Sequence, residues 1–171
     1  GHKGGGAWDQ EHKIAVSTGI SPIAGRVVIA PNFVFGPFHA RKPLRMQPGD
    51  RRSVGSIAFE MALVADGTYQ FAVFPSPKSW DVAAGMVLVK EAGGDVLSLE
   101  PNSARWTQFD RFSNTEEPGP PGQTTLREWK SSILVGNPIM ASFVSKNLKR
   151  RKRRRTFAFL GQLKSMLRKQ N

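Results

Sequence analysis

The apolar residues between positions 53 and 67 recur at the spacing of a helix with one buried face. Ile57, Met61 and Val64 share that face, Ser56 can cap the start of the helix, and Gly67 can close its end. Free backbone N–H groups and the positive end of the helix dipole make such a start suitable for binding phosphate. Most helix starts rich in Ser and Gly bind no ligand, however, so the pattern alone favours a purely structural cap.

A second helix is predicted within Lys78–Gly94. Val82, Met86 and Val89 fall at i, i+4 and i+7 and form its apolar face, and the two glycines at its end supply a residue of positive φ. The small residues of its first turn, Ala83–Gly85, leave room for another backbone to approach closely.

An acidic residue, Asp81, lies where this second helix begins, beside the bulky Trp80. A carboxylate at that position suits either a helix N-cap or a metal ligand. From spacing alone the N-cap is the commoner case, because Asp is among the residues preferred there.

Strand and helix patterns alternate along most of the chain. The strand predictions, the first three of them weaker, are Lys13–Ser17, Val27–Ala30, Phe33–Phe35, Tyr69–Phe74, Asp95–Leu99 and Ile133–Gly136. Asn137 and Pro138 start a further helix with an apolar side, Met140, Phe143, Val144 and Leu148. Gly36–Asp50 and Pro101–Lys130 are predicted to be loops, since Pro and Gly interrupt them. This alternation predicts an α/β layer and not a helical bundle or a β-sandwich.

Composition limits the class of protein further. The chain has 171 residues, 39% hydrophobic, which is enough for one globular domain. It has no cysteine, which excludes disulfides, Cys-bound zinc and thiol chemistry. No apolar run approaches the roughly 18 residues of a membrane helix, and no signal peptide is evident, so we expect a cytoplasmic protein.

The net charge of +12 is concentrated at one end of the chain. Residues Lys149–Asn171 hold ten Lys and Arg and no acid, which leaves fifteen basic against thirteen acidic residues in 1–148. The tail opens with seven consecutive basic residues, Lys149–Arg155, and continues into a basic amphipathic stretch, Phe159–Arg168. We therefore divide the chain into an α/β domain, 1–148, and a basic tail, 149–171. Such a tail suits an anionic membrane surface or nucleic acid, or it is a solvated extension without a partner.

Five short motifs together resemble the C-terminal half of the inositol monophosphatase family. They are Gly6-Ala-Trp8, Arg52-Ser-Val-Gly-Ser56, Trp80-Asp-Val-Ala-Ala-Gly85, Glu91-Ala-Gly-Gly94 and Leu134-Val-Gly-Asn-Pro138. The resemblance covers roughly residues 4–148, except for a loop at 101–130 that is longer than is usual in the family. The Trp-Asp motif followed by Glu-Ala-Gly-Gly is its most specific part.

The resemblance implies a Mg²⁺-dependent phosphomonoesterase that acts on a small sugar or polyol phosphate. It implies the C-terminal α/β part of a layered αβαβα sandwich and, as in the family, a homodimer. Asp81 would bind both metal and substrate, and the backbone of Gly55, Ser56 and Ile57 would face the substrate. These roles agree with the preference of Mg²⁺ for hard oxygen ligands.

Two departures from the family pattern limit what the resemblance implies. The other metal-binding carboxylates of the family lie in its N-terminal half, in a Glu-Glu pair and an Asp-Pro-x-Asp-Gly-Thr motif, and that arrangement does not occur here. We therefore expect no complete catalytic site in this chain and no activity from it alone. Inositol-specific members also carry a Glu where this chain has Phe74. A different sugar phosphate, a nucleotide-type phosphate or histidinol phosphate thus stays open as substrate.

Two hypotheses follow. The first is that the chain is the C-terminal part of a metal-dependent phosphatase. The second is that it is a non-catalytic relative or an anchoring module that acts through its basic tail on an anionic membrane or nucleic acid.

Overall fold

The computed structural model describes residues 2–20, 27–29, 37–46, 49–112, 126 and 129–151. Its helices in these ranges are α1 (Lys42–Met46), α2 (Ile57–Ala65), α3 (Ser79–Glu91) and α5 (Pro138–Asn147). Its strands in these ranges are β1 (Trp8–Asp9), β2 (His12–Lys13), β3 (Val27–Ile29), β4 (Phe38–Ala40), β5 (Asp50–Arg51), β6 (Tyr69–Phe74), β7 (Asp95–Leu99), β8 (Thr107–Gln108), β9 (Ser132–Gly136) and β10 (Leu148–Arg150).

A mixed sheet forms the centre of the described structure. Its strand order is β5-β3-β6-β9-β7-β8, with β3 parallel to both β5 and β6. Strand β9 is antiparallel to β6 on one side and to β7 on the other, so β6 and β7 run in the same direction. The two small sheets β1-β2 and β4-β10 lie outside it.

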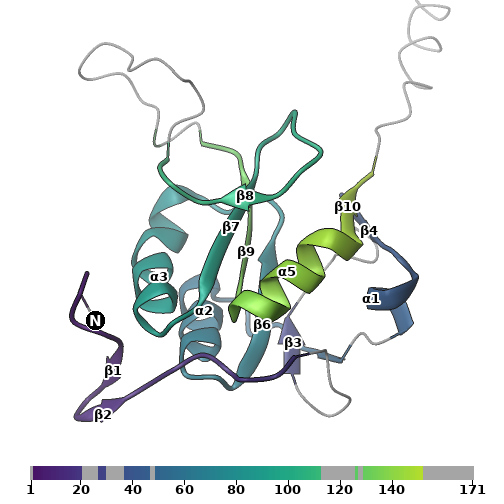
Figure 1. The fold of residues 1–171 in the computed structure, drawn as a ribbon. Helices are drawn as coiled ribbons and strands as arrows, with labels where there is room; N and C mark the ends of the chain where they lie inside the picture. Colours follow the sequence, from purple (N-terminus) through teal and green to yellow (C-terminus); the bar gives the residue numbers. More distant parts are fainter. Residues whose placement is uncertain are drawn as a thin grey trace, which may run out of the picture.

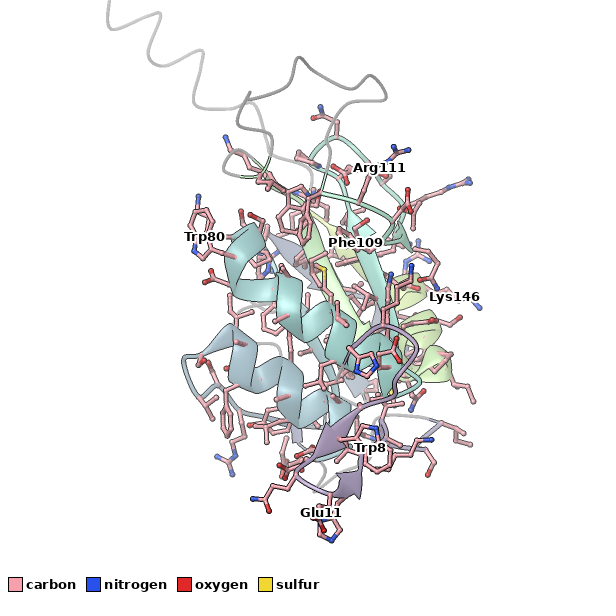
Figure 2. The ribbon with its side chains drawn as sticks, turned by 90° about the vertical axis from the view of Figure 1, so that its left-hand side faces the viewer. Trp8, Glu11, Trp80, Phe109, Arg111 and Lys146 are labelled. Carbon is pink, nitrogen blue, oxygen red and sulfur yellow. The ribbon has the colours of Figure 1, made fainter. Side chains whose placement is uncertain are left out.

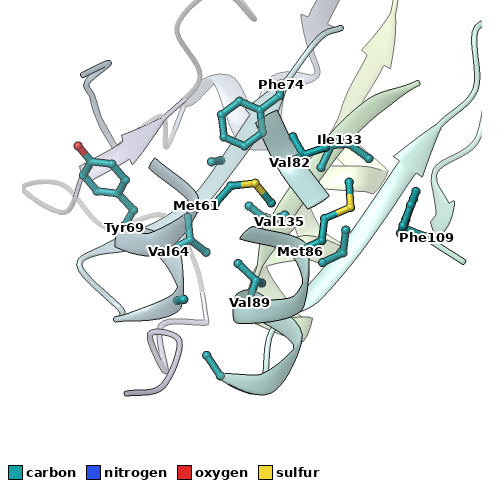
Figure 3. Packing of buried hydrophobic residues seen from close by; sticks show 14 of the residues in the cluster. Met61, Val64, Tyr69, Phe74, Val82, Met86, Val89, Phe109, Ile133 and Val135 are labelled. Carbon is teal, nitrogen blue, oxygen red and sulfur yellow. The ribbon is translucent and has the colours of Figure 1, made fainter. Parts of the chain in front are cut away.

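Helices cover both faces of this sheet (Figure 1). Strand β6 is buried along its whole length, and its side chains alternate between two cores. Ala72 and Phe74 pack with α2 and α3, as Figure 3 shows for Phe74, whereas Phe71 and Val73 pack with α5. A strand buried on both faces reads as a nearly continuous apolar run, and in β6 only Gln70 is polar. The predicted α/β fold class is confirmed.

The predicted start of α2 and the predicted glycine stops of α2 and α3 are confirmed as well. Ser56 is the N-cap of α2, and its hydroxyl accepts a hydrogen bond from the N–H of Phe59. Gly67 and Gly93 follow α2 and α3 with φ of 81° and 82°. Glycine adopts this left-handed conformation without the cost that a Cβ would add.

Two sequence predictions are wrong in part. Gly36–Asp50, predicted as a loop, contains β4, α1 and β5. Pro43 is compatible with α1 because it lies in the first turn, where a backbone N–H has no helical partner. In Lys13–Ser17 only Lys13 is in a strand, since the N–H groups of Ile14 and Val16 bond to separate places, the carbonyls of Ala7 and Ala92.

Other predicted segments lie partly or wholly outside the described residues. Phe33–Phe35 and the amphipathic stretch Phe159–Arg168 are wholly outside, and only 149–151 of the basic tail is described. Of the predicted strand Val27–Ala30, the described part is β3. In Pro101–Lys130 the described part includes β8 and two buried aromatic residues, Phe109 and Trp129. Phe112 meets both rings edge to face, at centroid distances of 4.9 and 5.1 Å. The described part of this predicted loop thus contributes to the core.

Helices α2 and α3 pack closely because Gly85 has no side chain. A Cβ at Gly85 would lie 2.7 Å from the sulfur and 2.8 Å from the Cβ of Met61, which is fully buried. The small residue that matters in α3 is therefore Gly85, whereas Ala84 is exposed. The partner that approaches it is a side chain and not, as the sequence suggested, a backbone.

The carboxylate of Glu91 holds the N-terminal segment against the end of α3. Its Oε1 accepts a hydrogen bond from the N–H of Gly4 at 2.7 Å and its Oε2 from the N–H of Gly6 at 2.9 Å. These two bonds lower the pKa of the Glu91 carboxyl below its ordinary value.

Replacing Gly85 with Ala should destabilise the protein, by about 1–3 kcal/mol, because the added methyl group overpacks the contact with Met61. In an exposed helix the same change would stabilise by up to about 1 kcal/mol. Urea unfolding measures the difference, with the exposed Ala84→Leu as control. A Gly85→Ala protein as stable as wild type would contradict the described packing.

The contribution of Glu91 to stability should disappear in acid. Since folding lowers its pKa, its hydrogen bonds stabilise the protein above the unfolded value, 4.5, and are lost as the pH falls through the folded value. The Tm of wild type should therefore exceed that of Glu91→Gln at pH 7, and the two should converge in acid once the pH has fallen below the lowered folded value. The control is Glu11→Gln, at an exposed position. A Tm difference that does not vary with pH would contradict this role.

Candidate active site

Both helices of the α2–α3 layer begin at the same edge of the sheet. Strands β5, β6 and β7 run parallel, and α2 connects β5 to β6 as α3 connects β6 to β7. Each helix therefore starts beyond the carboxyl end of a strand. In α/β sheets this edge is where ligands bind, and the positive ends of both helix dipoles add a preference for anions.

The start of α2 presents unused hydrogen-bond donors at this edge. Gly55 has φ of 82° and turns the chain into the helix, and an added Cβ there would meet nothing within 4 Å. The backbone N–H groups of Ser56, Ile57 and Ala58 have no hydrogen-bond partner within the described part of the chain. This is the arrangement that binds phosphate oxygens at a helix N-terminus.

A buried carboxylate, that of Glu60, fixes the loop before α2. Glu60 is 2% exposed, and its Oε1 accepts hydrogen bonds from the Oγ of Ser53 and from the N–H groups of Val54 and Gly55, at 3.1, 2.8 and 3.3 Å. The N–H of Gly55 is therefore already engaged. Burial, and after it the charge of Glu60, raises the pKa of the Tyr69 hydroxyl.

A small pocket of about 220 Å³ opens beside this loop. It is lined by the loop, the first turn of α2 and the end of β6, namely Ser53, Gly55, Ile57, Glu60, Val73, Phe74, Pro75, Ser76 and Pro77. Phe74 contributes an apolar wall where the family's inositol-specific members were expected to place an acid. The pocket therefore lacks an acceptor at this position, and its side-chain acceptors are those of Ser53, Glu60 and Ser76.

Four residues separate the end of β6 from the start of α3. The connection is held by two serine hydroxyls: Ser132 Oγ donates to the carbonyl of Pro75, and Ser79 Oγ donates to that of Leu126 at 2.8 Å. Trp80 is 63% exposed and projects from the start of the helix, as Figure 2 shows.

The N-cap of α3 is Lys78, so the interpretation of Asp81 as an N-cap is wrong. Asp81 is the third residue of the helix and is half-buried. Its backbone N–H donates to the carbonyl of Lys78 at 3.1 Å, and its carboxylate has no hydrogen-bond partner among the described residues. A carboxylate in a first helical turn is stabilised by the dipole and stays available to a ligand.

The residues described do not make a complete metal site. They contain no group of three or more His, Asp or Glu side chains that could hold a metal ion together. Mg²⁺ prefers octahedral coordination by oxygen, with one or two carboxylates and further ligands. Asp81 fits one such ligand and no more.

The structure brings three of the predicted substrate residues together and places the fourth on the neighbouring helix. Gly55, Ser56 and Ile57 form the start of α2, and Gly55 and Ile57 line the pocket. Asp81 is not among the lining residues. Sequence reasoning missed Glu60, although a charged residue beside Ile57 and Met61 on an apolar helical face indicates a buried, hydrogen-bonded carboxylate.

The architecture is an α/β sandwich whose candidate site lies where two helices start. Similarity to known proteins identifies its family. The profile of the inositol monophosphatase family matches residues 7–137, so the chain belongs to the inositol monophosphatase family. This confirms the resemblance predicted from the motifs.

Two curated relatives match parts of the chain. Over 57 residues it is 51% identical to Nus factor SuhB of Xylella fastidiosa, covering 33% of this chain and 21% of that protein. Over 53 residues it is 36% identical to fructose-1,6-bisphosphatase/inositol-1-monophosphatase of Aquifex aeolicus, covering 31% and 20%. The chain thus aligns with about a fifth of each relative's length.

Solved structures of the family share the fold. An IMPase of Thermotoga maritima superposes with a TM-score of 0.55 at 24% identity, over 85% of this chain and 48% of that one. Staphylococcal IMPase-II with bound inositol monophosphate gives 0.55 at 20% identity, over 84% and 48%. The chain spans about half the length of these structures.

Replacing Glu60 should loosen the loop before α2. Glu60→Ala removes the acceptor of three hydrogen bonds and leaves buried donors unpaired, which costs about 1–3 kcal/mol. Glu60→Gln keeps one acceptor oxygen and should cost less. Urea unfolding and amide exchange at Val54 and Gly55 test this. Unchanged exchange at those two amides in Glu60→Ala would contradict the role of the carboxylate.

Proposed function

We propose that this chain forms the substrate-facing side of a Mg²⁺-dependent phosphomonoesterase that hydrolyses a small sugar or polyol phosphate. One observation carries the proposal: the unpartnered N–H groups at the start of α2 and the unpartnered Asp81 carboxylate at the start of α3 occur at the same edge of the sheet. Membership of the inositol monophosphatase family supports it.

In this proposal each group of the chain has a distinct task. The N–H groups of Ser56 and Ile57 donate hydrogen bonds to the substrate beside its phosphate. Asp81, which accepts but does not donate when ionised, supplies one oxygen ligand to Mg²⁺ and contacts the substrate. Bound Mg²⁺ would neutralise phosphate oxygens and lower the pKa of water. The remaining ligands are carboxylates that the described residues do not supply.

The pocket beside the loop before α2 indicates which substrates the site favours. Phe74 is 3% exposed and packs into the core between the sheet and α3 (Figure 3), so it cannot accept a hydrogen bond from a sugar hydroxyl. An inositol phosphate would lose that contact. We therefore propose that the substrate is a phosphate ester whose hydroxyl groups form hydrogen bonds elsewhere in the site. A homodimer, which the family resemblance implies, belongs to the same proposal.

The second candidate function is that of a non-catalytic relative. It is favoured by the 51% identity over 57 residues to a protein named as a Nus factor and by the lack of a metal-holding cluster among the described residues. The two candidates differ in whether Asp81 matters for turnover.

Activity measurements separate the candidates. The isolated chain should show no Mg²⁺-dependent release of phosphate from sugar phosphates, because one carboxylate cannot hold the metal. A polypeptide that joins this chain to the family's N-terminal carboxylates should be active, and Asp81→Asn should lower its kcat by at least about 10²-fold. The control is Asp95→Asn, at the first residue of β7, which follows the C-terminal end of α3.

Three outcomes would count against the proposal. The first is Mg²⁺-dependent turnover by the isolated chain, and the second is normal turnover in Asp81→Asn. The third, no turnover in the joined polypeptide despite a folded structure and bound Mg²⁺, would favour the non-catalytic candidate.

A further inference from the structure

A second and larger hollow lies outside the α2–α3 layer. It has a volume of about 1130 Å³ and is lined by the β4–β10 sheet, its flanking residues and the turn after β7, namely Pro37, His39, Arg41, Pro101, Asn102, Ser103, Ala104, Lys149, Arg150 and Arg151. We call it the basic groove. Strands β4 and β10 bury Phe38 and Leu148 in the core that includes α5, so the groove belongs to that side of the sheet (Figure 1).

No Asp or Glu is among the residues that line the basic groove. Within the described ranges the single salt bridge joins Arg111 and Asp110, which lie elsewhere. Glu100 is the acid whose charge acts on Arg150, yet it forms no salt bridge there. Several positive charges in one concave surface create a potential that attracts anions.

Arg150 is held in the wall of the groove in a partly desolvated state. Its Nη2 donates to the carbonyl of Leu99 at 3.3 Å and to the Oγ of Ser132 at 3.1 Å, and its guanidinium lies 5.7 Å from the centre of the Phe38 ring. Its Nε is buried without a hydrogen-bond partner among the described residues. Burial lowers the pKa of the guanidinium. A fixed cation of this kind is stabilised by an anion close by.

We propose that the basic groove binds the sugar-phosphate backbone of single-stranded nucleic acid. Proteins hold single strands with positively charged grooves that follow the backbone, combined with aromatic side chains on which bases stack. The groove is larger than the roughly 300–1,000 Å³ of a small-molecule pocket, so it can take several phosphates in succession. No aromatic residue except His39 lines it, so bases have few stacking partners and sequence preference should be weak.

The shape and composition of the groove disfavour a membrane surface. A bilayer is flat on this scale and cannot enter a concave groove. Peripheral membrane sites also insert large apolar side chains. The exposed ones in the described chain, among them Trp8, Phe59 and Trp80, do not line the groove.

The proposal is independent of the phosphatase edge. The helix that carries Asp81 and Trp80 lies on the opposite side of the molecule from α5, which carries Lys146 (Figure 2). Loss of nucleic-acid binding should therefore leave the phosphatase activity intact, and loss of the phosphatase activity should leave nucleic-acid binding intact.

Fluorescence anisotropy of the full chain with a labelled 20-residue oligouridine tests the proposal. The variant Arg41→Gln/Lys149→Gln removes two groove charges, and Lys3→Gln/Lys13→Gln removes two exposed charges near the N-terminal β1–β2 hairpin. Log Kd plotted against log salt concentration has a slope of about 0.7 per phosphate contact for single strands. The groove variant should bind more weakly and lower that slope by about 1.4, whereas the hairpin variant should match wild type.

Vesicles of phosphatidylcholine and phosphatidylserine serve as the competing ligand. Binding to oligouridine with the stated change of slope supports the proposal. Wild-type affinity and slope in the groove variant, with circular dichroism confirming its fold, would place the binding elsewhere, for example in the basic residues after Arg151. Equal loss in both variants, or binding to vesicles without binding to oligouridine, would also overturn it.

Discussion

The close contact between Gly85 of α3 and Met61 of α2 is the constraint on which the rest of the structure depends. Without a side chain at Gly85 the two helices lie together on one face of the sheet, and a methyl group would force them apart. Because both helices connect parallel strands, packing them side by side also brings their N-termini to one edge. The packing of α2 against α3 therefore determines both the core between the helices and the position of the candidate site.

That edge is well supplied with hydrogen-bond donors and poorly supplied with acceptors. The start of α2 offers backbone N–H groups, and Glu60 consumes its own Oε1 in holding the loop. Asp81 is the carboxylate left for a cation. Such an edge suits the phosphate of a substrate and one side of a metal ion. It requires further carboxylates, since the described residues hold no group of three that could bind a metal ion. The basic groove, beyond α5, is a separate cationic surface.

Local sequence patterns predicted those helices and strands whose structure depends on residue type and spacing within the element. The Ser56 cap, the Gly67 and Gly93 stops and the apolar strand Tyr69–Phe74 follow from residue type and spacing. The sequence did not predict strands that form only because a segment far away in the chain pairs with them. Strand β4 exists because β10, more than 100 residues away, pairs with it, and neither strand has a local signal. The hydrogen bonds of Glu60 are likewise tertiary contacts, as is the pairing of Lys149 and Arg150 that joins the start of the basic tail to the folded domain.

A crystal structure of this chain joined to the family's N-terminal carboxylates, grown with phosphate and Mn²⁺ in place of Mg²⁺, would show whether Asp81 and the start of α2 bind one metal–phosphate site. We expect an anomalous peak about 2.1 Å from an Asp81 carboxylate oxygen and phosphate beside the start of α2. A metal bound without Asp81, or phosphate bound away from the N–H groups of Ser56 and Ile57, would contradict it.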